Sequence, residues 1–264
     1  MHNPYMTQAY EVLEIRKETE IDYTYRIAYE GKPLIGGQFM EISMPGVGEA
    51  PISISFVGDG FLEMTIRKVG RLTDRIFEMK IGDFLQMRGP YGNGFELEHF
   101  RNKDLAFIAG GTGLAPVRNT IHYFATHPEE VKNLELLVGF KSPKDRLFVK
   151  DLEAWSKDNK VVVTVDQGDE EWQGEVGLIT KHIEQLDLSQ VASKVAIVVG
   201  PPIMMKFTTL ELVKKGFLEE NIWVSFERKM SCGIGKCGHC KIDETYVCLE
   251  GPVFPYTKAK QLLD

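Results

Sequence analysis

The chain has few cysteines, no long apolar run and no excess of positive charge. Its 264 residues include four cysteines, which all lie between positions 232 and 248, so the rest of the chain offers no thiol. No apolar stretch approaches the roughly 20 residues that cross a bilayer. The formal net charge of −7 and the lack of a basic tract argue against nucleic acid as a partner. The N-terminus, Met1-His-Asn-Pro-Tyr, has neither the charged nor the apolar region of a secretory signal, which predicts a cytoplasmic protein.

The four cysteines form one motif with gaps of four, two and seven residues. The first three follow the spacing C-x4-C-x2-C, which is typical of plant-type [2Fe–2S] ligation. The glycines between them reach positive φ values easily and let the backbone approach an inorganic core. The predicted ligands are Cys232, Cys237, Cys240 and Cys248, and the glycines are Gly233, Gly235 and Gly238.

Two other uses of these cysteines remain open. Tetrahedral zinc on four cysteines is one alternative, although structural zinc sites usually pair two C-x2-4-C segments across a longer gap. Disulfides are the other, but a chain of 264 residues without a secretory segment has no need of them. His239 lies inside the loop and is expected to face solvent rather than to act as a fifth ligand.

Residues 1–99 consist of short β-like runs that are separated by glycine and proline. Most runs alternate apolar and polar residues, the period of a sheet with one buried face, and they recur about every 10 to 15 residues. This pattern predicts a small antiparallel β-barrel. The runs begin at Tyr10, Tyr23, Gln38, Pro51, Phe61 and Phe84.

The pattern changes in residues 100–226, where continuous apolar runs alternate with helical segments. The runs begin at Leu105, Leu134, Val161 and Val195, and helices are expected near 116–127, 147–156, 177–186 and 203–216. Alternating β and α elements predict a doubly wound parallel α/β sheet. Residues 227–264 contain few apolar side chains apart from the cysteine motif, so this third module is expected to fold around its cluster.

Two glycine turns suit a bound anion. Gly70-Arg-Leu-Thr73 opens a helical segment, where free N–H groups favour a pyrophosphate, although a G-x-x-T turn alone is more often an ordinary capped turn. Gly110-Gly-Thr-Gly-Leu-Ala-Pro116 stands between a buried strand and a helix, and Pro116 fits the first turn of that helix.

Together these segments resemble the ferredoxin–NADP reductase superfamily, whose barrel binds a flavin and whose α/β domain binds a nicotinamide dinucleotide. The resemblance implies that FAD contacts Pro51, Ile52, Ser53, Ile54, Gly70, Arg71, Leu72 and Thr73. Ser53 is the residue placed at the flavin N5 atom, where it would act in catalysis. The superfamily's usual arginine is replaced by Ala50, so Arg67, Lys68 or Arg71 would supply the positive charge at the phosphates.

In the second domain the same resemblance places the dinucleotide at Gly110, Gly111, Thr112, Gly113, Ala115 and Pro116, with Gly200 and Pro201 beside the nicotinamide. The superfamily's cysteine at that position is replaced by Val199, so no thiol helps to position the ring. The strand that ends at Val165 is followed by Asp166 and three further carboxylates, where NADPH enzymes usually carry serine and arginine. A carboxylate such as Asp166 accepts a hydrogen bond from ribose hydroxyls and repels a 2′-phosphate, which predicts NADH.

The order of flavin domain, nicotinamide domain and C-terminal cysteine loop resembles the electron-transfer subunit of dihydroorotate dehydrogenase. A further resemblance, over nearly the whole chain, is to the B subunits of anaerobic sulfite reductase. It rests on Val47-Gly-Glu-Ala-Pro-Ile-Ser-Ile, Val198-Val-Gly-Pro-Pro-Ile-Met and the motif that runs from Glu227-Arg to Cys240.

The sulfite reductase resemblance implies electron flow from NADH through FAD and a [2Fe–2S] cluster to iron–sulfur and sirohaem subunits that reduce sulfite to sulfide. The alternative is an electron-transfer subunit that serves dihydroorotate or hydrogen metabolism. A zinc-stapled, nucleotide-binding regulatory protein is the alternative from another class. With four cysteines committed, the chain has none left for a sirohaem centre of its own.

Overall fold

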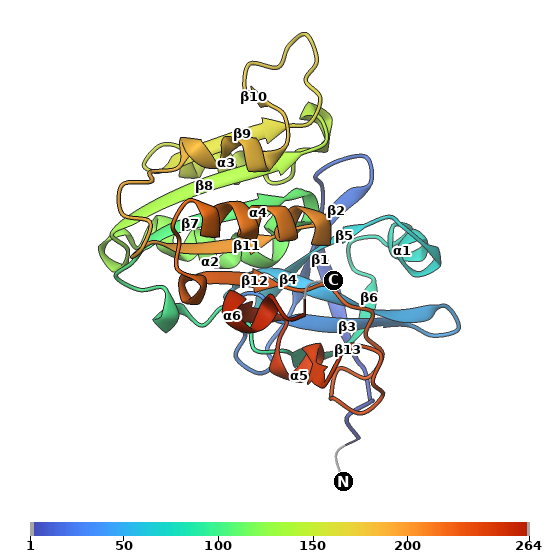
Figure 1. Cartoon of the computed structure of the whole chain (residues 1–264). Coiled ribbons are helices and arrows are strands. Elements are labelled where there is room, and N and C mark those ends of the chain that lie inside the picture. The colour runs from blue at the N-terminus through green and yellow to red at the C-terminus, as the bar shows by residue number, and fades with distance from the viewer. Residues whose placement is uncertain (1–2, 263–264) are drawn as a thin grey trace.

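The computed structural model describes residues 3–262, which form a β-barrel, an α/β sheet and a small cysteine-bearing segment (Figure 1). The barrel is closed by antiparallel strands in the order β1-β2-β5-β4-β3-β6. Its interior holds alternate residues of the strands, among them Tyr25, Met40, Ile42 and Leu62, which are fully buried. The strands are β1 (Gln8–Lys17), β2 (Asp22–Ala28), β3 (Phe39–Met44), β4 (Gly48–Gly58), β5 (Phe61–Arg67) and β6 (Phe84–Tyr91), and α1 (Arg71–Ile76) lies between the last two.

All six runs expected in residues 1–99 are strands of this barrel, so the predicted antiparallel barrel is confirmed.

The second unit is a seven-stranded sheet in the order β10-β9-β8-β7-β11-β12-β15. Its strands pair in parallel except β15, which is antiparallel to β12. The strands are β7 (Asp104–Gly110), β8 (Asn133–Phe140), β9 (Lys160–Val165), β10 (Glu175–Val176), β11 (Val195–Val199), β12 (Ile222–Ser225) and β15 (Val253–Pro255).

Helices cover both faces of this sheet, as the doubly wound prediction requires. On one face, α2 (Leu114–Thr126) and α3 (Val149–Trp155) pack against Phe107 and Leu136. On the other face, α4 (Pro202–Lys214) and the 3₁₀ helix Ile179–Gln185 pack against Ile108. An α-helix was expected near 177–186, and the structure has the tighter 3₁₀ form there; shorter 3₁₀ turns are Leu97–His99, Gly111–Gly113, Pro128–Glu130, Pro143–Asp145 and Glu219–Asn221.

The C-terminal segment is tied to the sheet more closely than its composition indicated. It contains β13 (Lys241–Ile242), β14 (Thr245–Tyr246), α5 (Val247–Glu250) and α6 (Tyr256–Ala259). Phe254, Tyr256 and Ala259 are buried in the same apolar cluster as Ile108 of the central strand. The segment therefore owes its packing to the dinucleotide sheet as well as to the cysteine loop.

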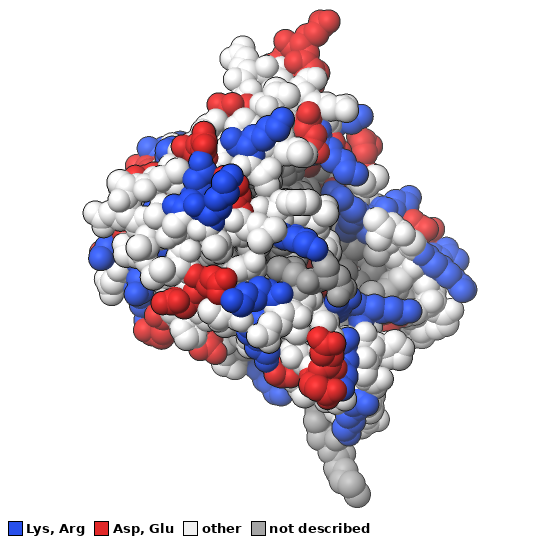
Figure 2. Space-filling model, in the orientation of Figure 1, with Lys and Arg blue, Asp and Glu red and all other residues white. Residues whose placement is uncertain are grey.

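No helix within residues 3–262 has the length and apolar character needed to span a bilayer. On the face shown in Figure 2, positive and negative side chains are interspersed and form no continuous basic tract. The predicted cytoplasmic location stays a prediction.

Candidate functional site

A cavity of about 790 Å³ opens at the carboxyl ends of the parallel strands. β7 ends at Gly110 and is followed by Gly111 and Thr112, Lys141 follows β8, and Pro201 follows β11. The chain leaves β7 toward β8 on one side and returns to it with β11 on the other, so the cavity lies where the strand order reverses. Open α/β sheets bind their ligands at such a point, and the volume suits a cofactor.

The glycine turn brings two backbone segments close together. A Cβ atom at Gly113 would come within 2.5 Å of the Val199 carbonyl oxygen and 2.7 Å of Gly200. Gly111 has a φ of 55°, which side chains rarely adopt. Gly113, Ala115 and Pro116 are buried and therefore build the turn, whereas Gly110, Gly111, Thr112 and Pro201 face the cavity. Their contact with a dinucleotide stays a prediction.

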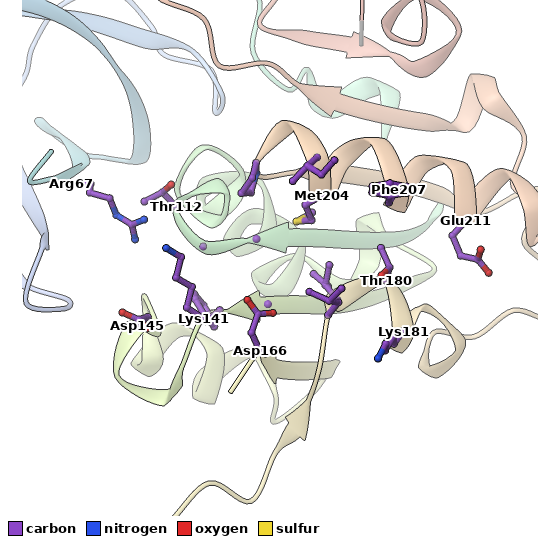
Figure 3. A pocket seen from close by; sticks show the side chains of 18 of the residues that line it. Arg67, Thr112, Lys141, Asp145, Asp166, Thr180, Lys181, Met204, Phe207 and Glu211 are labelled. Atoms are coloured by element: carbon purple, nitrogen blue, oxygen red, sulfur yellow. The ribbon is translucent and has the colours of Figure 1, made fainter. Parts of the chain in front are cut away.

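Asp166 lines the cavity, and the other three predicted carboxylates do not. Figure 3 shows Asp166 projecting from the end of β9 on the side of the cavity where Lys141 also lies. Asp169, Glu170 and Glu171 are exposed on the loop that follows. Of the acidic run, only Asp166 is therefore placed to meet a ligand.

The wall opposite the sheet belongs to the barrel. Arg67, at the end of β5, lines the cavity and donates two hydrogen bonds to Asp22, with Nε–Oδ1 and Nη2–Oδ2 distances of 2.8 and 3.0 Å. The fully buried Asp22 carboxylate holds Arg67 at this cavity, and the contact of Arg67 with the flavin phosphates that the resemblance implies stays a prediction. Lys68 and Arg71 lie outside the cavity lining, and the Lys68 ammonium lies 5.8 Å from the centre of the Phe77 ring.

Glu227 belongs to the motif that precedes the cysteines, and the sequence predicted no role for it. Desolvation raises the pKa of its carboxyl, and the nearby charge of Arg67 opposes that rise. Glu227 itself is exposed and does not line the cavity, although its carboxyl interacts with the charge of Arg67. The short motif Glu227-Arg before the cysteines was the one available signal.

The flavin residues lie on one strand and one helix start. In the register of β3 and β4, Ser53 pairs with Phe39 and Ile52 pairs with Met40. Ile52 packs on the barrel core beside Met40, so Ser53 projects from the opposite, outer face of the strand, as does Pro51. Ile54 is buried in the core.

The turn before α1 is capped by Thr73. Its hydroxyl accepts hydrogen bonds from the N–H groups of Val69 and Gly70 at 2.9 and 3.0 Å and donates to the Gly70 carbonyl at 2.9 Å. Apart from the neighbouring residues of the chain, no atom lies within 4 Å of a Cβ built on Gly70, so the space in front of the turn is open. Arg71 and Leu72 are the next two residues of this turn. The open turn is compatible with a phosphate, and the capped-turn interpretation also holds.

The cysteine loop directs its backbone N–H groups at sulfur. Ile234 and Lys236 donate to Sγ of Cys232 at 3.4 and 3.3 Å, and Gly235 donates to Sγ of Cys248 at 3.2 Å. The φ angles of Gly233, Gly235 and Gly238 are 69°, 68° and 78°, so the glycines adopt the expected positive values.

Cys237 interacts with Cys232, and Cys248 interacts with both Cys240 and Cys232, so the four thiols lie near one another. All four are free of disulfides, and Cys237 alone is exposed. Within residues 3–262, no three His, Cys, Asp or Glu side chains are arranged around a single metal ion. Four thiols near one another, with backbone N–H donors to the sulfurs of Cys232 and Cys248, are what a two-iron cluster requires, so these residues fit the predicted group.

The protonation of the thiols differs with burial. Burial raises the pKa of Cys248 to about 12, and its neighbour Cys240 adds to the rise. A hydrogen bond from the His239 N–H group lowers the pKa of Cys237. Metal binding requires thiolates, so a cluster would have to displace the proton from the buried Cys248.

Two family models match the chain. Residues 107–209 match the oxidoreductase NAD-binding domain, and residues 227–260 match the iron–sulfur cluster binding domain of dihydroorotate dehydrogenase B. The first match contains the strands and turns around the cavity, and the second contains all four cysteines.

Relatives are similar over almost the whole chain. The sulfhydrogenase 1 subunit gamma of Pyrococcus furiosus is 37% identical over 271 residues, which cover 96% of this chain and 92% of that protein. A probable dihydroorotate dehydrogenase B (NAD(+)) electron transfer subunit of the same organism is 34% identical over 86% of this chain and 81% of its own.

A solved structure of an NADH-dependent reduced ferredoxin–NADP oxidoreductase covers all of this chain and 93% of its own, with 25% identity and a TM-score of 0.78. These relatives support the predicted alternative, a subunit of hydrogen or dihydroorotate metabolism, better than the sulfite reductase interpretation. The chain belongs to the family of NAD(P)H-oxidising flavin and iron–sulfur electron-transfer subunits that have a ferredoxin–NADP-reductase-like NAD-binding domain and a cluster domain of the dihydroorotate dehydrogenase B type.

Proposed function

We propose that this chain oxidises NADH and delivers the electrons, through FAD and a [2Fe–2S] cluster, to a partner subunit of the hydrogenase type. The observation that supports this most is the gathering of four thiols on a loop whose backbone N–H groups donate to sulfur, on a chain whose candidate dinucleotide cavity is lined in part by the barrel. When bound, the flavin would accept hydride from NADH and release electrons singly, which the cluster would carry onward.

The chain's own residues would hold these groups. The turn Gly110–Thr112 would meet the dinucleotide phosphates with its N–H groups, and Pro201 would shape the nicotinamide side of the cavity. Ser53 would donate a hydrogen bond to the flavin ring from the outer face of β4, and Thr73 would order the turn that meets the flavin phosphates. Cys232, Cys237, Cys240 and Cys248 would ligate the iron.

Asp166 supports NADH over NADPH. It is the residue of the acidic run that lines the cavity, and a carboxylate there accepts hydrogen bonds from ribose hydroxyls but repels a 2′-phosphate. Asp166→Ser is expected to raise kcat/KM for NADPH at least tenfold relative to NADH. Asp169→Ser, on the exposed loop, is the matched control and should leave the preference unchanged. Equal effects of the two substitutions would contradict the assignment of Asp166.

A role for Ser53 is tested by Ser53→Ala. The substitution removes a hydroxyl from the outer face of β4 and should slow flavin reduction by NADH in rapid-mixing measurements. An unchanged rate, with an unchanged flavin spectrum, would remove Ser53 from the site.

The partner of the hydrogenase type is supported by the 37% identity to a sulfhydrogenase gamma subunit over nearly the whole chain. A sulfite-reducing partner with iron–sulfur and sirohaem subunits is the second candidate, supported by the sequence motifs around Val47, Val198 and Glu227. To identify the partner, the NADH-reduced protein is mixed in turn with a purified hydrogenase, sulfite reductase or dihydroorotate dehydrogenase catalytic subunit. The production of hydrogen, the production of sulfide and the turnover of dihydroorotate are then measured.

The first experiment is anaerobic purification followed by visible spectra before and after NADH, with iron, sulfide, flavin and zinc analysis. We expect about two irons and two sulfides per chain, with loss of flavin and cluster absorbance on adding NADH. A colourless, zinc-loaded protein that does not respond to NADH would overturn the proposal.

A further inference from the structure

A buried arginine of the barrel donates hydrogen bonds to the start of the cysteine loop. Arg88, near the end of β6, is 5% exposed and lies 144 residues before Cys232 in the chain. Its Nη1 atom donates to the Cys232 carbonyl oxygen at 2.6 Å, and its Nη2 atom donates to the Ser231 carbonyl oxygen at 2.7 Å. One planar guanidinium therefore holds two successive carbonyl groups at the first predicted iron ligand.

The other contacts of Arg88 fix its orientation. Glu49, on β4, forms an ion pair with it through Nη2, and its second oxygen accepts from Nε at 3.2 Å. The Tyr91 hydroxyl accepts from Nη1 at 3.0 Å. Every nitrogen of the guanidinium thus has a partner, which leaves the side chain little freedom to move away from the loop.

A second carboxylate adds to the negative charge under the loop. Glu41 pairs with Arg88 in the register of β3 and β6, is fully buried, and has no hydrogen-bond partner for either oxygen among the described residues. One guanidinium is therefore shared electrostatically between Glu49 and Glu41. Because the guanidinium contacts the backbone at Cys232, its positive charge lies close to a negatively charged cluster.

We propose that Arg88 is a positioning residue for electron transfer, which anchors the cysteine loop to the flavin barrel and raises the reduction potential of the cluster through its buried charge. The proposal rests on the proposed function, because it needs a cluster at the four cysteines. Reduction adds one negative charge to the cluster, so a buried cation nearby favours the reduced state and a buried carboxylate disfavours it. The two hydrogen bonds also hold the loop against β6, and the ion pair with Glu49 ties Arg88 to β4, the strand that carries the predicted flavin residues.

Three substitutions separate the effect of the Arg88 charge from the effect of its hydrogen bonds to the loop. Arg88→Gln removes the charge and the forked geometry. Arg88→Lys keeps the charge but, with a single ammonium, cannot hold both carbonyl groups in the same way. Glu49→Gln removes the opposing carboxylate and leaves Arg88 in place. Arg101→Gln is the matched control, because Arg101 also pairs with two carboxylates and a tyrosine hydroxyl. These partners are Glu98, Glu130 and Tyr123, and none of them belongs to the cysteine loop.

Two measurements are made on the intact, iron-loaded protein: the midpoint potential of the cluster by EPR-monitored titration, and amide hydrogen exchange of residues 231–240. Arg88→Gln should shift the cluster equilibrium at least tenfold toward the oxidised form, about 59 mV for a one-electron couple. Glu49→Gln should shift it the opposite way. Arg88→Lys should keep the equilibrium constant for cluster reduction within threefold of the native value but increase the amide exchange rate of the loop about tenfold. Arg101→Gln should change neither.

An iron-loaded Arg88→Gln protein with native potential and native loop exchange would overturn the proposal. If both Arg88 variants lose iron, Glu49→Gln decides: a positive shift supports the proposal, and an unchanged or negative shift overturns it. A native protein that shows no iron–sulfur EPR signal after chemical reduction would overturn the proposed function and, with it, the claim about the potential. In that case the loop exchange of Arg88→Gln still tests the anchor.

Discussion

The barrel contacts the dinucleotide domain and the cysteine loop through two buried ionic clusters of opposite charge balance. On the dinucleotide side, one carboxylate has three arginines: Glu63, 1% exposed, accepts hydrogen bonds from Arg16, Arg26 and Arg118. Arg118 belongs to α2 and also donates to Asp151 of α3 at 2.5 Å. Burial alone would raise the pKa of Glu63, but hydrogen bonds from Arg16 and Arg118 outweigh it and hold the pKa at about 2.

On the cysteine side, one arginine faces two carboxylates. Burial raises the pKa of Glu41 to about 7, although the charge of Arg88 opposes the rise. The first cluster is therefore fully paired and charged at any physiological pH, whereas the second contains a group that changes charge near neutrality. The difference indicates that the dinucleotide domain is fixed firmly on the barrel, while the attachment of the cysteine loop responds to charge. The predictions below test this difference in decreasing order of expected effect.

Glu63→Gln should cost most, because it leaves three arginines around a neutral side chain. Breaking a buried ion pair by removing one partner costs about 3–5 kcal/mol, and we expect a loss near the lower end in urea unfolding at pH 7. The control is Glu14→Gln, whose carboxylate contacts Arg16 and Arg26 at 3.5 and 3.0 Å but is 37% exposed. That substitution should cost less than about 1 kcal/mol. Similar losses for the two would show that Glu63 does not fix the domains.

The same carboxylate sets the acid limit of this interface. Because the folded pKa of Glu63, about 2, lies below the ordinary value of 4.5, its contribution is present above pH 4.5 and is lost as the pH falls toward 2. The Glu63→Gln protein should therefore show a weaker fall in stability across that window than the native protein.

Glu41→Gln should act in the opposite direction and in a different pH window. The folded pKa of Glu41, about 7, lies above the ordinary value of 4.5, so the native protein loses stability as the pH rises from 4.5 through 7. Since one pKa unit corresponds to about 1.4 kcal/mol, this loss amounts to at most about 3 kcal/mol. The variant should match the native protein near pH 5 and be more stable by up to that amount at pH 8.

The control for Glu41 is Glu63→Gln, because Glu63 stays ionised at both pH values and its cost should not change between them. If the free energies of unfolding of Glu41→Gln and of the native protein differ by the same amount at pH 5 and at pH 8, the carboxylate under the loop is not an ionisable, unpaired group. That result would also remove the contrast between the two clusters.

The features predicted from sequence are those that local pattern determines. The barrel strands follow from an alternation of period two, the glycine turn at Gly110 from its place between a strand and a helix, and the gathering of the four thiols from their spacing. β15 was not foreseen, because it is three residues long and its partner β12 lies about 30 positions earlier in the chain. A pattern that short is set by long-range pairing and not by its own sequence.

Both ionic clusters were also missed, for a related reason. Arg88 was expected to lie on a strand, but nothing in its neighbourhood indicates a contact 143 or 144 residues away. Glu63 and Glu41 interrupt apolar runs and were interpreted as the polar positions of half-exposed strands. Which outward-facing side chains are covered depends on how the domains pack around the barrel, and that packing is not encoded in any one window of sequence.

The smallest expected effect concerns two asparagines that join the same units without charge. Asn93 donates to the Val253 carbonyl oxygen at 2.8 Å and to that of Glu250 at 3.2 Å, and its Oδ1 accepts from the Val253 N–H group at 3.2 Å. Asn119 of α2 makes one such bond, from the Val57 N–H group at 3.1 Å. Each net hydrogen bond is worth about 1 kcal/mol, and two of the three Asn93 bonds come from the same Nδ2 group, so Asn93→Ala should cost about 2 kcal/mol and Asn119→Ala about 1 kcal/mol. This order is the reverse of that expected for the ionic clusters, and urea unfolding at pH 7 measures it. A larger loss at Asn93 would mean that neutral backbone bonds hold the cysteine segment where its ionic anchor is short of positive charge, whereas a larger loss at Asn119 would mean that the dinucleotide interface is the stronger one in both kinds of contact.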